Sequence, residues 1–160
     1  MLFVIIIFIL KFGFNKKVIE MDFLTGKYQF NTKGNSDIVD LTGFVENTIA
    51  ENGFTEGNVL LFVPGSTAAV TTIEFEPGLL KDFPEFWDRE VPAGKIYHHD
   101  MTWHDGNGHS HIRASLQGPS LHIPFIDKKL TLGTWQQIIF IDFDTRPRER
   151  TVIWQIIGNK

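Results

Sequence analysis

The chain contains no cysteine among its 160 residues. This absence excludes disulfide bonds, thiolate metal ligands and cysteine nucleophiles, and it is compatible with a reducing compartment, so we expect a cytoplasmic protein. Positive charge is also scarce, because 15 Lys and Arg stand against 19 Asp and Glu and give a net charge of −4. Without a general basic surface, a nucleic-acid-binding protein is not expected.

A hydrophobic run long enough to span a membrane is missing as well. Residues 1–10 are all apolar, but a spanning helix needs about 20 such residues. A signal peptide carries its positive charge before the apolar run, whereas the first lysine here, Lys11, follows it. We therefore expect no membrane role. We interpret residues 1–20 as an apolar N-terminal extension translated from an early start codon, and residues 21–160 as the domain.

What the chain does have is the composition of one globular domain. Hydrophobic residues make up 42% of it, and the 15 Phe and 4 Trp predict an aromatic core. A chain of this length buries roughly two-thirds of its unfolded surface. The fold therefore needs no metal ion to hold it together.

Strand-like patterns dominate both ends of the domain. Alternating or continuous apolar runs predict strands at residues 23–32, 36–41, 58–63, 68–75, 120–126, 130–144 with a break near Gly133, and 150–157. Apolar residues at helical spacing predict two main helices, at about 42–51 and 79–89. This order predicts a single-domain α+β fold of mostly antiparallel strands.

All six histidines lie between residues 98 and 122, and five of them lie within residues 97–111. Imidazole is a common metal ligand and the usual acid–base group at neutral pH. His109 and His111 would share one face of a strand but would diverge by about 200° on a helix, and the local sequence fits either. With His98 or His99 they would form a three-imidazole, zinc-type site, and the Asp100 carboxylate would either hydrogen-bond to one of these ligands or be a further ligand.

The alternative is that these histidines only form hydrogen bonds with the loop backbone. His104 and His122 are interpreted as bystanders in either case. His122 alternates with apolar residues in a predicted strand, so its side chain is expected on the more polar face.

Other segments could also bind a ligand. Gly65, Ser66 and Thr67 follow a predicted strand and could approach a phosphate, although such a segment is also typical of a turn. Trp135, after Gly133, is either a core residue at a β-bulge or a ring for ligand stacking. Residues 144–150 contain three arginines, which indicate a solvated hairpin end or, alternatively, a phosphate site.

Four motifs in this order resemble the YjbQ-like family over about residues 23–158. They are GSTAAVTTIE at 65–74, YHHD at 97–100, GHSHIRASLQG at 108–118 and LGTWQ at 132–136. The resemblance implies a small trimeric α+β protein with thiamine phosphate synthase activity. One position departs from the family pattern, because Gly65 stands where members often have histidine.

The resemblance also implies roles for individual residues. It implies a divalent metal, zinc or magnesium, bound by His99, His109 and His111. Phosphate contacts are then expected from Ser66, Thr67 and Arg113, stacking or orientation from Trp135 and Gln136, and proton transfer or orientation from Glu74 and Asp100.

The resemblance thus implies a metal-dependent thiamine phosphate synthase that joins a pyrimidine methyl diphosphate to a thiazole phosphate. Its partners would be small phosphorylated substrates and two further copies of the chain. One alternative is a metal-dependent hydrolase of a phosphate or amide. Another is a non-catalytic module that binds a metal or a small molecule.

Overall fold

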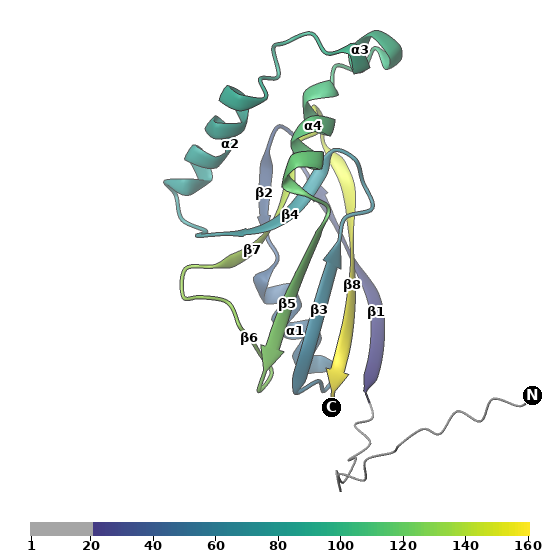
Figure 1. Cartoon of the computed structure of the whole chain (residues 1–160), viewed down its shortest axis with the longest axis vertical. Helices are drawn as coiled ribbons and strands as arrows, with labels where there is room; N and C mark the ends of the chain where they lie inside the picture. The colour runs from purple at the N-terminus through teal and green to yellow at the C-terminus, as the bar shows by residue number, and fades with distance from the viewer. Residues whose placement is uncertain (1–20) are drawn as a thin grey trace, which may run out of the picture.

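The computed structural model describes residues 21–160, which form two antiparallel sheets and four helices (Figure 1). The predicted extension at residues 1–20 lies outside the described residues, and the boundary at residue 21 stays a prediction. The larger sheet has the order β1 (Asp22–Thr32), β8 (Arg148–Asn159), β3 (Glu56–Phe62), β5 (Ser120–Ile126) and β6 (Lys129–Leu130). The smaller sheet has the order β2 (Asp37–Asp40), β7 (Gln137–Asp142) and β4 (Ala68–Ile73). The helices are α1 (Thr42–Glu51), α2 (Leu79–Glu90), α3 (His98–Trp103) and α4 (Gly108–Gln117).

The main core lies between the two sheets. Apolar side chains from β3, β5 and β8 pack there against α1 and against one face of β4 and β7. Tyr28 of β1 packs against this core next to α1, and its hydroxyl donates a hydrogen bond to the Phe44 carbonyl. The regular alternation of β1, predicted from the sequence, follows from this arrangement because only one face of the larger sheet is covered.

A second core lies on the other face of the smaller sheet. Ile139 and Ile141 of β7 pack there with Trp87 of α2 and Ala114 of α4. Their neighbours in the strand, Ile138 and Phe140, point to the main core instead. This explains the continuous apolar run in β7, since a strand covered on both faces has no polar side.

The α+β fold predicted from the sequence is confirmed, and both predicted helices are present as α1 and α2. The structure also contains α3 and α4, which the sequence pattern of the histidine segment did not predict. Within the described residues, no helix is long and apolar enough to cross a membrane.

Candidate functional site

The helical conformation of α4 separates two of the histidines. Residues two apart on a helix differ by about 200° around its axis, so His109 and His111 point in different directions. His109 is 3% exposed and lies beside the ring of Tyr97, with 6.3 Å between the ring centroids. His111, by contrast, lines an open cleft. The sequence was compatible with either a strand or a helix around His109 and His111, and the structure shows a helix.

His111 pairs instead with His99 of α3. The centroids of their rings are 4.3 Å apart and the rings are inclined by 44°. On its other side, Nε2 of His99 lies 3.7 Å from a carboxylate oxygen of Asp105. No group of three or more His, Cys, Asp or Glu side chains that could hold a metal ion occurs among residues 21–160. His99, His109 and His111 therefore do not converge, although the first and last of them do.

The cleft beside His111 has a volume of about 350 Å³. Its walls come from α4 and from the loop between β3 and β4. The lining residues are Gly65, Ser66, Ala68, His111, Ala114, Ser115 and Pro119. Most of the lining is thus small or apolar, and its polar groups are one imidazole and two hydroxyls. Ser115, four residues after His111 on α4, was not identified from the sequence because that spacing has meaning only on a helix.

The pKa of His111 lies below its ordinary value of 6.5. Burial is the main cause, since it disfavours the charged imidazolium, and the neighbouring His99 acts in the same direction. At neutral pH His111 is therefore uncharged, and it can accept a proton from a molecule in the cleft.

Asp100 connects the starts of α3 and α4. One of its oxygens accepts a hydrogen bond of 2.9 Å from the Gly108 amide, and the other accepts one of 3.3 Å from the Tyr97 amide. Gly108 has no room for a side chain, because a Cβ there would lie 2.5 Å from that of Tyr97. Asp100 thus fixes the two helices that carry His99 and His111, and both of its oxygens are engaged in doing so.

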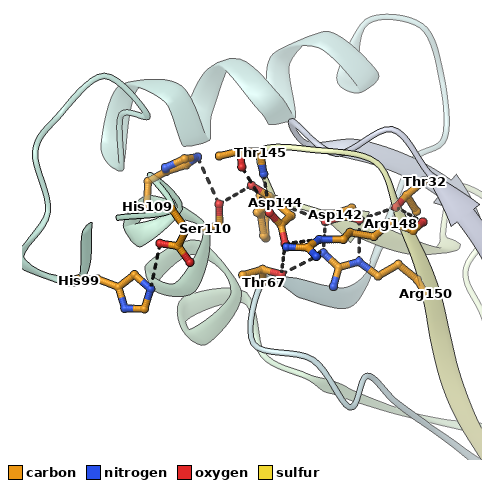
Figure 2. Close-up of polar contacts among 12 residues, drawn as sticks. Thr32, Thr67, His99, His109, Ser110, Asp142, Asp144, Thr145, Arg148 and Arg150 are labelled. Atoms are coloured by element: carbon orange, nitrogen blue, oxygen red, sulfur yellow. Dashed lines mark hydrogen bonds and ion pairs between the residues drawn. The ribbon is translucent and has the colours of Figure 1, made fainter. Parts of the chain in front are cut away.

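An arginine–aspartate cluster, formed by Asp142, Asp144, Arg148 and Arg150, lies beside Thr67 (Figure 2). Asp142 is 0% exposed and binds Nε and Nη2 of Arg150. Arg148 binds Asp144 at 2.9 Å. Of the three arginines in residues 144–150, Arg148 and Arg150 thus belong to the cluster, whereas Arg146 is exposed as expected of a solvated turn. Asp142 and Asp144 are two residues apart, and so are Arg148 and Arg150, which is the spacing of side chains on one face of a strand. This spacing was the sequence signal for the cluster.

Thr67 belongs to this cluster rather than to the cleft. Its hydroxyl donates to Asp144 at 3.1 Å and accepts from Nη2 of Arg150 at 2.9 Å. Burial acts to raise the pKa of Asp144, but the hydrogen bond from the Thr145 amide and the charge of Arg148 together bring that pKa below its ordinary value. The cluster therefore anchors the start of β4 next to the exposed Ser66.

Arg113 points away from the cleft. Its side chain is 3% exposed, and its guanidinium donates to the Val91 carbonyl, to Asp88 and to Ser36. These contacts join α4 to the end of α2. Every nitrogen of Arg113 is thus engaged within the protein.

The remaining predicted site residues lie at the far end of β4. Glu74 is exposed just after the strand, and six residues at about 3.3 Å each place it roughly 20 Å from the cleft. Gln136 donates to Thr72 near the same end and accepts from the Gly133 amide. Trp135 beside it is 69% exposed, so it is not the core residue of a bulge. The structure does not bring Glu74, Trp135 or Gln136 together with His111.

Comparisons with known proteins give a consistent picture. A family model described as "UPF0047 protein YjbQ-like" matches residues 26–159. A UPF0047 protein of Archaeoglobus fulgidus is 43% identical over 73% of this chain and 88% of its own length. The crystal structure of a YbjQ-like protein of unknown function from Sulfolobus solfataricus matches with a TM-score of 0.82 and 29% identity, over 88% of this chain and all of that one. A YjbQ/UPF0047 protein of Clostridium acetobutylicum matches with a TM-score of 0.74 and 34% identity, over 82% and 98% of the two chains.

These findings correct the predicted function. The similar proteins carry the family name alone or are described as of unknown function, so they give no support to thiamine phosphate synthase activity. The metal-dependent mechanism also required three converging ligands, and the described residues offer no such group. The prediction of a metal-dependent thiamine phosphate synthase is therefore wrong. Binding of zinc or magnesium as such stays a prediction.

Proposed function

The chain belongs to the YjbQ-like UPF0047 family, and from that premise we propose that its cleft binds a small molecule from which His111 accepts a proton. One observation carries the proposal: an uncharged imidazole and two serine hydroxyls line the same cleft of about 350 Å³. A cleft with mostly apolar walls and a few polar groups is typical of small-molecule sites. The role requires no metal ion.

His99 would support this role through its contact with the His111 ring. Its ring lies 4.3 Å from that of His111, so it restricts the orientation of the His111 ring. Asp105, 3.7 Å from His99, would stabilise the charge when that ring becomes protonated. His111 would then touch the ligand, and His99 would act through His111 as a positioning residue.

The first experiment measures the protonation of each histidine ring by NMR as a function of pH. We expect His111 to titrate below 6.5, and the same ring in the urea-unfolded chain gives the reference. A His111 that titrates higher in the folded protein than in the unfolded chain would contradict the proposal.

The second experiment screens a library of small molecules by amide chemical shifts. We expect binders to shift Ser66, His111 and Ser115, and we expect His111→Gln to remove those shifts whereas His122→Gln preserves them. If a binder is turned over, His111→Gln should lower the rate by about 10²–10⁴-fold, the usual contribution of a general base. Binders that only shift residues outside the cleft would overturn the proposal.

We further propose that the chain associates with itself through the outer face of the larger sheet, as the homotrimer of the resemblance requires. Support comes from exposed apolar side chains on that face, where Phe23 lies beside Ile157 and Phe62 beside Ile153. Light scattering should give three times the chain mass of 18.3 kDa. A monomer mass at micromolar concentration would contradict this.

A further inference from the structure

We infer that the ligand of the cleft carries an oxyanion group, a carboxylate or a phosphate, which Nη1 of Arg150 binds in the space left open at Gly65. The inference rests on the proposed function and names the chemical class of its ligand. Ser66, exposed beside Gly65 in the same wall, adds a hydroxyl donor.

The arginine–aspartate cluster fixes the direction in which Arg150 points. Nε of Arg150 donates to Asp142 at 2.7 Å, and Nη2 donates to Asp142 and, at 2.9 Å, to Thr67. These bonds use one edge of the guanidinium. Among the hydrogen bonds of residues 21–160, none comes from Nη1. Because the guanidinium is planar and its other edge is held, the two free N–H groups of Nη1 have a fixed orientation.

Gly65 places this free nitrogen next to the cleft. A Cβ added at Gly65 would lie 3.6 Å from Nη1 of Arg150, and Gly65 itself lines the cleft. The backbone of Gly65 is outside the left-handed region, so the turn does not require glycine. Its missing side chain therefore serves to leave space, and the space lies directly over a free guanidinium nitrogen.

The surroundings of Arg150 favour a ligand of modest charge. Its side chain is only 13% exposed, so a hydrogen bond to an anion there is stronger than one in open water. Asp144 lies 3.5 Å from Nη2 and opposes an anion, but Arg148 binds that carboxylate at 2.9 Å. Two arginines thus face two aspartates, and the cluster is neutral before an oxyanion enters.

The test titrates ¹⁵N-labelled full-length protein with inorganic phosphate and, separately, with acetate, at constant ionic strength in chloride. We expect saturable shifts of the Gly65 and Ser66 amides and of the Arg150 Nε signal. A response to phosphate alone identifies the group as tetrahedral, and a response to both probes identifies a general oxyanion site.

Gly65→Val is the decisive variant because it fills the space over Nη1 of Arg150, where a Cβ would lie 3.6 Å away, and removes none of the hydrogen bonds of the arginine–aspartate cluster. We expect it to weaken phosphate or acetate binding at least about tenfold with an unchanged melting temperature. Gly94→Val is the control for adding the same side chain elsewhere, since a Cβ at Gly94 meets nothing within 4 Å, and it should bind as the unchanged chain does. Arg150→Gln should also abolish binding, but it leaves Asp142 unpaired and so tests the site less cleanly.

Two results would overturn the inference: no saturable shift at Gly65 and Ser66 with either probe, or equal weakening by Gly65→Val and Gly94→Val. If uncharged molecules still bound beside His111 in that case, the proposed function would stand without the oxyanion site. If neither class of molecule shifted the cleft residues, both would fail together.

Discussion

The arginine–aspartate cluster and the pair of His99 and His111 are two groups of polar side chains that differ in how far their polar atoms are bound by neighbouring residues. In the cluster, Asp142 has no exposed surface and each carboxylate is bound by an arginine. In the pair, the rings face each other at 4.3 Å, and Nε2 of His99 forms no hydrogen bond with any described residue.

The difference separates polar groups that hold the structure from polar groups that are available to a ligand. Buried charges persist only when they are paired and hydrogen-bonded, and they then fix the chain around them. The His111 ring, at the wall of the cleft, forms no hydrogen bond with any described residue and keeps its capacity to bind and to accept a proton. Arg150 combines both kinds of behaviour, since its Nε and Nη2 are bound while its Nη1 forms no hydrogen bond within residues 21–160.

The largest expected effect comes from removing one charge of the cluster. Asp142→Ala leaves Arg150 buried without its main partner and should lower the free energy of unfolding by about 3–5 kcal/mol. Urea unfolding measures it. Asp105→Ala removes the carboxylate beside His99, which is partly exposed, and should change that free energy by no more than about 0.5 kcal/mol. Equal losses in the two variants would contradict the comparison.

A smaller effect is expected at Arg113, which resembles the cluster in being buried and fully bound. Arg113→Met retains most of the side-chain volume but leaves the Val91 carbonyl without its donors, and it should lower the free energy of unfolding by about 1–3 kcal/mol. The affinity for phosphate, measured by the same NMR titration, should stay unchanged. Weaker phosphate binding without loss of stability would show instead that Arg113 contacts the ligand, as the sequence predicted.

The smallest expected effect is the dependence of the free energy of unfolding on pH. The histidines and the arginine–aspartate cluster should contribute to it in different pH ranges. His109 and His111 have a pKa lowered below 6.5 in the folded protein, chiefly by burial, so the unfolded chain binds protons more readily. Their contribution to stability is therefore fully present above pH 6.5 and declines as the pH falls through that value toward their folded pKa values. Asp144, whose pKa is lowered from 3.8, contributes above that value and loses its contribution only as the pH falls below it.

Urea unfolding at pH 7.5 and pH 5.5 measures the part due to histidine. The free energy of unfolding should fall between these values by at most about 1.4 kcal/mol for each unit of pKa shift. The fall should be smaller in His111→Gln and in His109→Gln than in the unchanged chain. An equal fall in the unchanged chain and in both variants would show that these two histidines do not cause it.

The regular parts of the fold could be predicted because their patterns are local. The strand expected at 23–32 is found as Asp22–Thr32, and the helix expected at 79–89 is found as Leu79–Glu90 with Pro84 inside it. α4 could not be predicted, since its sequence fits a strand as well. What fixes α4 is its contact with distant segments: the Ser110 hydroxyl binds the Phe143 carbonyl, and Arg113 binds Asp88.

By itself, the sequence determined the α+β architecture and the YjbQ-like family, because alternation, helical spacing and local motifs depend on neighbours along the chain. Only the tertiary structure decided which histidine faces the cleft and that Asp142 and Arg150 form a buried pair. It also placed Glu74, Trp135 and Gln136 away from His111. The physical reason is that burial and convergence depend on which distant segments pack together: Arg150 meets Thr67, which lies 83 residues earlier in the chain.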